Sequence, residues 1–211
     1  MHTHSFADYV ERLDRGDWAG VGQLMLSSAH KLAASGADFL ICPDNTIHQA
    51  LVHIEHLSPL PWLHIADTVA AEASRQGYRR LGLTGTKWLV ESDVYPQKLR
   101  ARGIDYLRPT HDEREETNRV IMDELVCGIF KPDGVAAFQQ LIDRFRGDGC
   151  DAVVLGCTEI PLIISDANSS LPTLDSTRLL ARGALREACS VPEPSRAAAR
   201  NPPDRSNRAR P

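Results

Sequence analysis

Short apolar runs alternate with amphipathic, helix-length stretches along most of this chain, and the stretches end at glycines or at polar turn residues. Alternation of this kind is typical of βαβ units, in which crossover helices join parallel strands. The pattern predicts strands over residues 38–42, 61–65, 80–83, 104–107 and 152–155. It predicts helices over residues 17–35, 46–54, 68–76, 92–102, 115–125, 134–145 and 179–188. The sequence therefore predicts an α/β fold with a mainly parallel sheet.

The first predicted strand lacks an upstream strand to pair with, because residues 1–15 supply little apolar sequence. Repeated strand-and-helix units lead us to expect that the chain is short at its amino end. Either a first βα unit has been lost, or the start methionine has been assigned too late.

Charge is distributed unevenly along the 211 residues, whose net charge is −4. Residues 191–211 hold five arginines against two acidic residues, so residues 1–190 alone carry a net charge of −7. An acidic body disfavours nucleic acid as a partner. The basic tail is proline-rich and lacks bulky apolar residues, which predicts disorder rather than a contact with nucleic acid or a membrane.

Membrane insertion and disulfide formation are not expected. No apolar run approaches the length of a membrane span, and the first residues do not form a signal peptide, so we expect a cytoplasmic protein. The five cysteines show neither even pairing nor Cys-x-x-Cys spacing, which argues against a disulfide framework and against a structural zinc site. Free thiols are the simpler interpretation.

Two of the predicted strands, far apart in the sequence, end at polar turns with reactive side chains. The first runs into Cys42-Pro43-Asp44-Asn45-Thr46, and the second runs into Gly156-Cys157-Thr158-Glu159. Ligands collect at the carboxyl ends of strands in open parallel sheets, so we expect the two turns to face each other across a cleft. That arrangement suits proton transfer on opposite faces of one small molecule.

Each turn also has a simpler interpretation. Pro43-Asp44-Asn45 consists of residue types that favour a turn, and Asn45 or Thr46 can cap the following helix without any further role. Cys157 precedes Pro161, a frequent first-turn residue of helices, and a thiol at a helix amino terminus has a lowered pKa. An inert buried cysteine is nevertheless the commoner case.

Several other residues have competing interpretations. Thr84-Gly85-Thr86-Lys87 follows a strand but departs from the phosphate-loop order, in which lysine directly follows glycine. His48, His53 and His56 lie at helical spacings that could bring two imidazoles together, as at a metal site. A solvated helix surface is nevertheless the expected arrangement of these histidines. His64 either packs between the two halves or lines the cleft, and Glu159 either orients His64 or caps its own helix, with capping favoured.

Taken together, the two turns resemble the cofactor-independent aspartate/glutamate racemase family, within the Asp/Glu/hydantoin racemase superfamily. The resemblance is carried by Asn45-Thr46-x-His48 after one strand and by Gly156-Cys157-Thr158-Glu159 after another. Further segments resemble the same family: Ser5-Phe6-Ala7-Asp8, Gly16-Asp17-Trp18, Gly36-Ala37-Asp38-Phe39, Pro61-Trp62-Leu63-His64-Ile65-Ala66-Asp67, Leu83-Thr84-Gly85-Thr86 and Ser92-Asp93-Val94-Tyr95. The resemblance extends from about residue 3 to residue 188 and leaves only the tail uncovered.

The resemblance implies two pseudo-symmetric α/β lobes, each with a parallel sheet flanked by helices, and an active site between the lobes. Residues 1–66 together with 172–190 would form the first lobe, and residues 67–171 the second. The family's glycine-rich opening strand and loop would precede Met1, in line with a short amino end. The resemblance also implies a homodimer, and a mechanism that needs no pyridoxal phosphate, other cofactor or metal.

Family members use two cysteines on opposite faces of the substrate α-carbon, one removing a proton as thiolate and the other donating a proton as thiol. Cys157 matches the second cysteine, whereas Asp44 stands where the first is found. Asp44 can exchange a proton if burial raises its pKa toward neutrality, or it simply positions the turn. Cys42, one pleat deeper on the same strand face, is an alternative acid/base group. The remaining substrate-binding roles fall on Asn45, Thr46, Thr86, Thr158 and Glu159.

Departures from the family pattern bear on the substrate. Leu89 stands where the family often has threonine, and no cation appears at residues 125–128, near which some aspartate-selective members carry lysine. An ionised Asp44 would also repel a substrate carboxylate. We predict an isomerase that racemises a small, aspartate- or glutamate-like amino acid. The alternatives are a one-cysteine enzyme of the decarboxylase or one-sided proton-exchange type, and a non-catalytic binder of small carboxylates.

Overall fold

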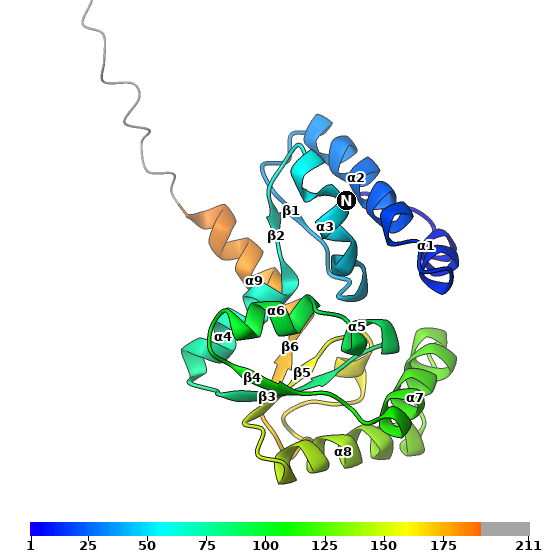
Figure 1. The fold of residues 1–211 in the computed structure, drawn as a ribbon, viewed down its shortest axis with the longest axis vertical. Coiled ribbons are helices and arrows are strands. Elements are labelled where there is room, and N and C mark those ends of the chain that lie inside the picture. Colours follow the sequence, from blue (N-terminus) through cyan, green and yellow to red (C-terminus); the bar gives the residue numbers. More distant parts are fainter. Residues whose placement is uncertain (191–211) are drawn as a thin grey trace, which may run out of the picture.

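The computed structural model describes residues 1–190, and the tail for which we predict disorder, residues 191–211, lies outside that description. Figure 1 shows two groups of elements, each built around a parallel sheet with helices beside it. The predicted α/β class with two parallel sheets is therefore confirmed. Within the described residues, no helix is both long and apolar enough to cross a bilayer.

The larger sheet contains β3 (Arg80–Thr84), β4 (Asp105–Leu107), β5 (Ala152–Leu155) and β6 (Thr173–Asp175). The strand order is β4-β3-β5-β6, and every neighbouring pair is parallel. All four residues of β5 are buried, which explains its continuous apolar sequence and why its bounds are predicted correctly. The prediction omits β6, because three residues of mixed polarity do not stand out as an apolar run.

Helices cover both faces of the larger sheet (Figure 1). One face carries α4 (Ile65–Gln76), α6 (Val94–Arg100) and α9 (Ser176–Cys189), and the other carries α8 (Pro132–Gly147), which packs beside α7 (His111–Arg119). Side chains alternate across each strand, so Leu81 and Leu83 face the first group while Val153 and Leu155 face α8. A Cβ at Gly82 would overlap the Phe145 ring, so glycine lets α8 lie close against the sheet.

The smaller sheet pairs β1 (Leu40–Ile41) with β2 (Trp62–Leu63), again in parallel. Its helices are α1 (Phe6–Asp14), α2 (Trp18–Ala34) and α3 (Leu51–Ile54), and α3 is flanked by tight 3₁₀ turns. Both strands are shorter than predicted, and the prediction omits α1. The spacing of Phe6, Val10 and Leu13 places apolar side chains on one face of α1, a signal that the prediction does not use.

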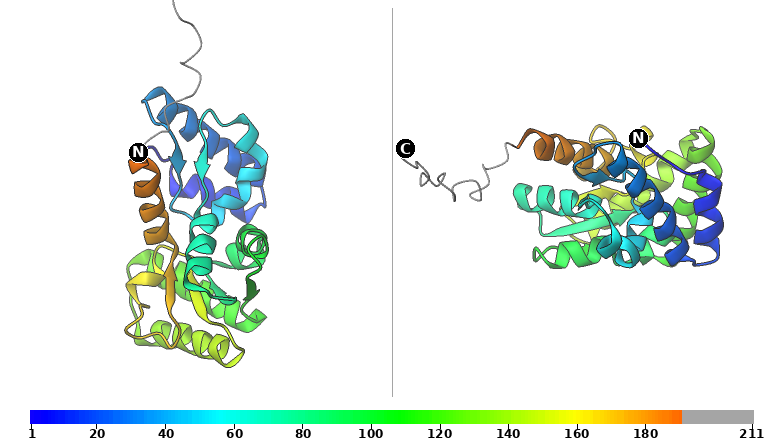
Figure 2. Two further views of the ribbon diagram at one scale, coloured as in Figure 1. Left: turned by 90° about the vertical axis from the view of Figure 1, so that its left-hand side faces the viewer. Right: turned by 90° about the horizontal axis from the view of Figure 1, so that it is seen from above.

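The last two elements connect the two groups. Residues 172–190 are predicted to complete the first lobe, but β6 instead pairs with β5 in the larger sheet. β5 is apolar and fully buried. Its pairing with β6 gives it a second neighbour strand besides β3. α9 packs mainly against α4 and also reaches β2, and Figure 2 shows it running along one side of the molecule.

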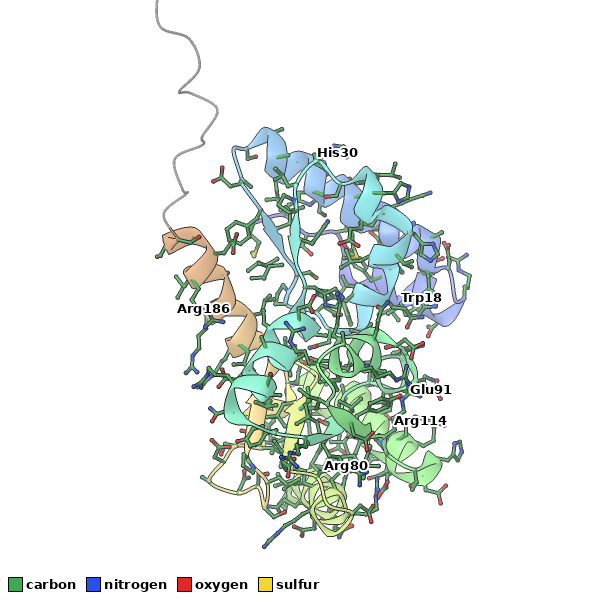
Figure 3. All side chains as sticks on the ribbon, turned by 60° about the vertical axis from the view of Figure 1, so that its left-hand side comes forward. Trp18, His30, Arg80, Glu91, Arg114 and Arg186 are labelled. Carbon is green, nitrogen blue, oxygen red and sulfur yellow. The ribbon has the colours of Figure 1, made fainter. Side chains whose placement is uncertain are left out.

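Two segments next to the junction of the lobes also differ from the prediction. The helix predicted over residues 115–125 begins earlier, as α7, and ends in a π turn over Val120–Glu124. The prediction omits α5 (Lys87–Glu91), which is too short for a periodic pattern. An ion pair of 3.0 Å joins Arg114 of α7 to Glu91 of α5 (Figure 3). This pair therefore ties together two helices that border the site described next.

Candidate active site

The turns that follow β1 and β5 line one cavity of about 310 Å³. All seven residues predicted for the site line this cavity: Asp44, Asn45, Thr46, Thr86, Cys157, Thr158 and Glu159. They come from segments separated by more than a hundred residues, and the parallel strands bring their carboxyl ends together. The expected cleft between the two turns is therefore present, with Asp44 and Cys157 in the same space.

Glycines at the ends of β3 and β5 allow the turns to pack this closely. The Gly156 N–H donates a hydrogen bond to the Thr84 carbonyl oxygen at 3.1 Å, and a Cβ at Gly156 would overlap that oxygen. Gly85 has φ of 150°, a conformation that side-chain-bearing residues rarely adopt. The two glycines thereby bring Thr86 and Cys157 to the edge of one cavity.

Asp44 is half-buried, and its Oδ1 accepts a hydrogen bond from the Ile47 N–H at 3.0 Å. Burial raises the pKa of Asp44, and the nearby Glu159 carboxylate acts in the same direction. Backbone N–H groups, including that of Ile47, oppose the shift but do not cancel it. Asp44 therefore binds a proton more readily than an ordinary aspartate does.

Cys157 points toward Glu159, with 2.9 Å between its Sγ and Oε2 of Glu159. Burial raises the pKa of Cys157, and the Glu159 carboxylate raises it further. The expectation of a lowered pKa at a helix amino terminus is wrong, because only a single 3₁₀ turn, Ile160–Leu162, follows the cysteine. At neutral pH this side chain is a thiol that donates a hydrogen bond.

Glu159 accepts two hydrogen bonds on the same oxygen. Besides the Cys157 thiol, the Thr158 hydroxyl donates to Oε2 at 2.6 Å. Glu159 neither caps the following turn nor orients His64, whose Nδ1 instead accepts a hydrogen bond from the Ala66 N–H at 3.2 Å. One carboxylate oxygen of Glu159 is therefore hydrogen-bonded to the side chains of both preceding residues.

Two threonine hydroxyls meet at the edge of the cavity. Thr46 Oγ1 and Thr86 Oγ1 are 2.9 Å apart, and Thr86 Oγ1 also accepts from the Leu89 N–H at 3.3 Å as the amino-terminal cap of α5. Because the pair shares one hydrogen bond, one of the two hydroxyl hydrogens is left to donate to a ligand. Lys87 does not join them, since its ammonium lies 5.1 Å from the centre of the Trp88 ring.

The side chain of Asn45 belongs to a buried hydrogen-bond chain. The Tyr95 hydroxyl donates to Asn45 Oδ1 at 2.6 Å, the Asn45 amide donates to Ser176 Oγ at 2.9 Å, and the Ser176 hydroxyl donates to the Leu155 carbonyl at 2.8 Å. Asn45 therefore lines the cavity with its side-chain amide already engaged. No hydrogen bond within residues 1–190 is formed by its backbone N–H or by that of Thr158.

Cys42, the alternative acid/base group, lines a different cavity. That space of about 670 Å³ lies against α1, α2 and β1 and shares Asp44 with the first cavity. Cys42 Sγ lies 3.9 Å from the Asp44 carbonyl oxygen, and burial, followed by the Asp44 charge, raises the pKa of the thiol to about 12. The structure does not bring Cys42 together with Cys157.

The histidines serve packing and turn geometry. His48 is buried, so the expected solvated surface is wrong for it, whereas His53 and His56 are exposed. His48 Nδ1 lies 2.7 Å from the Asp44 carbonyl oxygen, its Nε2 accepts from the Ile65 N–H at 3.3 Å, and its ring meets that of His64 edge to face. Within the described part of the chain, no three His, Cys, Asp or Glu side chains are placed to hold a metal ion.

Apolar side chains form the rest of the cavity lining, and the sequence analysis misses them. They are Phe6, Val10 and Leu13 of α1, Trp88 of α5, and Ile121, Met122 and Val126. For Phe6, Val10 and Leu13, the sequence does contain a signal, because spacings of four and three residues place them on one face of a helix. The π turn that turns Ile121 and Met122 toward the cavity has no comparable sequence signal.

Comparison with known proteins agrees with this geometry. The family model described as Asp/Glu/Hydantoin racemase matches residues 1–184. The broad specificity amino-acid racemase RacX of Bacillus subtilis is 24% identical over 165 residues, covering 76% of this chain and 69% of that protein. A Yersinia pestis structure assigned as an Asp/Glu racemase superimposes with a TM-score of 0.81 and 32% identity, covering 89% of this chain and 82% of that one. The structure of an aspartate racemase homologue from Pyrococcus horikoshii OT3 superimposes with a TM-score of 0.77 and 29% identity, covering 90% of this chain and 82% of that one.

Proposed function

This chain belongs to the Asp/Glu/hydantoin racemase family, and on that premise we propose that it interconverts the enantiomers of a small amino acid. Amino-acid racemases, the class to which its named relatives belong, are isomerases. One observation carries the proposal: Asp44 and Cys157, from distant segments, line the same cavity, and the pKa of each is raised. Two such groups serve the two faces of one α-carbon.

In this proposal Asp44 is the base and Cys157 the acid for one direction of the reaction. The Asp44 carboxylate takes the α-proton, and the electron pair of the broken C–H bond moves into the substrate carboxylate. The Cys157 thiol then donates its proton to the opposite face of the α-carbon. The product is the other enantiomer, and the site is left with protonated Asp44 and Cys157 thiolate, the forms that the reverse direction needs.

The substrate carboxylate, which gains negative charge during the reaction, needs hydrogen-bond donors. The free backbone N–H groups of Asn45 and Thr158 supply two of them, and the Thr46–Thr86 hydroxyl pair supplies a third. Donors of this kind stabilise the developing charge more than the ground state, which lowers the barrier to proton removal. The Glu159 carboxylate in turn attracts the substrate's α-ammonium group.

Incubation of the purified chain with amino acids in deuterium oxide tests the proposal. Nuclear magnetic resonance measures deuterium at the α-carbon, and chiral chromatography measures the enantiomer formed. A racemase gives exchange together with inversion. Thermal stabilisation by an amino acid without any exchange would make the chain a binder and contradict the proposal.

A second candidate function is one-sided proton exchange, because within residues 1–190 Cys157 is the one cysteine that lines this cavity. The Asp44→Asn variant separates the two candidates. For a racemase, inversion falls by at least about 100-fold, the usual contribution of an acid/base group. For one-sided exchange by Cys157, deuterium still enters with retention. Asp38→Asn, at an exposed position outside the cavity, is the matched control and leaves both rates unchanged.

A further inference from the structure

We propose that the amino acid turned over at this site carries an uncharged, apolar side chain larger than a methyl group, an inference that rests on the proposed function. The cavity has two chemically different sides. Its polar groups all come from the turns at residues 44–46 and 156–159 and from Thr86, where the α-carboxylate and α-ammonium groups are handled. The rest of the lining is apolar, and it is the part left to receive the substrate side chain.

Most of the apolar lining comes from two separate elements, and Trp88 and Val126 complete it. Phe6, Val10 and Leu13 lie on one face of α1, at a spacing that places them side by side along the helix. Ile121 and Met122 come from the π turn, whose backbone hydrogen bonds span five residues rather than four, so it presents adjacent residues differently from an α-helix. Ligand side chains are recognised on such surfaces by burying apolar area.

Charge points to the same class of substrate. Within the described residues, no Lys, Arg or His side chain lines the cavity, whereas the carboxyl groups of Asp44 and Glu159 do. A substrate with a second carboxylate would meet two acidic groups in a poorly solvated space and no cation, which is a repulsive arrangement.

Two cations adjacent in sequence to lining residues have partners of their own. Lys87 stacks on the Trp88 ring, and Arg119, just before the π turn, forms ion pairs of 2.7 Å with both Glu116 and Glu124. Glu124 itself is buried, so releasing Arg119 toward the cavity would leave a buried carboxylate with a poorer partner. Arg119 is therefore fixed in place and does not serve an acidic substrate.

The volume of the cavity sets the size of the side chain. The cavity has a volume of about 310 Å³. The α-carbon with its amino, carboxylate and methyl groups fills only part of that space. Leucine, methionine or phenylalanine uses the remainder, and their extra carbons contact the α1 and π-turn residues.

A panel of single L-amino acids in deuterium oxide tests the inference with the full chain. We expect deuterium incorporation at the α-carbon of leucine, methionine or phenylalanine with a kcat/KM at least tenfold above that of aspartate, glutamate and alanine. Faster exchange of aspartate or glutamate overturns this inference alone. Exchange with none of the panel overturns the proposed function and this inference with it.

A charge-introducing variant tests the same point within the protein. Val126 lines the cavity and is 42% exposed, so Val126→Lys places an ammonium at the apolar side without burying it in the core. We expect the ratio of aspartate to leucine turnover to rise at least tenfold. Val52→Lys, on the exposed face of α3 at 74% exposure, is the matched control and leaves the ratio unchanged. A ratio that is the same in Val126→Lys and wild type, with both proteins folded, overturns the inference.

Discussion

Cys157 differs chemically from a nucleophilic cysteine. Reactive thiolates are stabilised by cations or by the amino terminus of a long helix, whereas Cys157 has burial and the Glu159 carboxylate around it. Both raise its pKa, so the side chain rests as a thiol with a proton to donate. Burial also raises the pKa of Asp44, so its carboxylate is a stronger base than that of an ordinary aspartate.

Cys157→Ser is expected to lower the rate of inversion by roughly 100- to 10,000-fold, because a hydroxyl is a far weaker acid than a thiol. Chiral chromatography of the best substrate measures the change. Cys189→Ser, an exposed cysteine of α9 away from the cavity, is the control and keeps the wild-type rate. A Cys157→Ser protein that inverts its substrate at the wild-type rate would remove the thiol from the mechanism.

The Glu159 carboxylate gives a prediction about pH. In the direction in which Cys157 is the acid, turnover requires the protonated thiol, so it is lost at alkaline pH as the thiol ionises, and a raised pKa moves that loss above the ordinary thiol range. Glu159→Gln removes a negative charge beside the thiol, so the pKa of Cys157 falls and the alkaline loss moves to lower pH. Rate measurements across pH, with thiolate absorbance as an independent readout, check the direction. An unchanged alkaline limb would show that Glu159 does not control the thiol.

At the scale of elements, the hydrogen-bond chain through Asn45 links four pieces of the fold. Tyr95 lies in α6, Asn45 in the turn after β1, Ser176 at the start of α9 and Leu155 at the end of β5. Leu155 precedes Cys157 by two residues, so the chain fixes the turn that bears Asp44 relative to the turn that bears Cys157. Tyr95 is thus a positioning residue that contacts no substrate.

Tyr95→Phe leaves the buried Asn45 oxygen without its donor, which costs about 1–3 kcal/mol of the free energy of unfolding. Urea unfolding measures this loss. Because the two turns lose their fixed spacing, we also expect kcat to fall several-fold while KM changes little. Tyr106→Phe is the control, since the hydroxyl of Tyr106 contacts only the exposed Arg100, and it changes stability by less than about 0.5 kcal/mol. A less stable Tyr95→Phe with wild-type kcat would limit Tyr95 to a purely structural role.

The elements that the sequence predicts best are those whose signal is local. β5 is a buried apolar run, and α2 and α4 end at the predicted glycines, so each is recognisable on its own. The turns at Asp44 and Cys157 are recognisable because their residue types are chemically unusual at the end of a strand. What escapes prediction involves tertiary contacts, since β6 pairs with β5 and the π turn buries side chains in the same apolar cluster as α8.

The same limit applies to the candidate site. Its polar half is predicted by motif, because Asn45-Thr46 and Gly156-Cys157-Thr158-Glu159 are contiguous. Its apolar half is assembled from α1 and the π turn, and no sequence pattern connects those two segments. The sequence also predicts the wrong direction for the Cys157 pKa shift, because burial, followed by the Glu159 carboxylate, raises that pKa in the folded chain.

At the scale of the whole molecule, His48 joins the part of the chain built around β1 to the start of α4. One of its ring nitrogens contacts the Asp44 carbonyl, and the other accepts from the Ile65 N–H where α4 begins. Burial, then the neighbouring His64 and the more distant Lys98 charge, lower the pKa of His48 to about 3. Burial likewise lowers the pKa of His64 to about 4, again with Lys98 acting in the same direction.

These two histidines make the whole fold sensitive to acid. Between the ordinary histidine pKa of 6.5 and about 3, the unfolded chain binds a proton at His48 that the folded chain does not. Stability therefore falls as pH falls through that window, by on the order of 1.4 kcal/mol per pH unit for each such group.

His48→Gln keeps a hydrogen-bonding side chain but cannot titrate. Urea unfolding between pH 6 and roughly pH 4 should therefore show a dependence of the unfolding free energy on pH with about half the wild-type slope, with His64 supplying the rest. His53→Gln, an exposed control on the same segment, keeps the wild-type slope. Equal slopes in all three proteins would mean that the acid sensitivity of the fold arises from its carboxyl groups rather than from the histidine that connects its two halves.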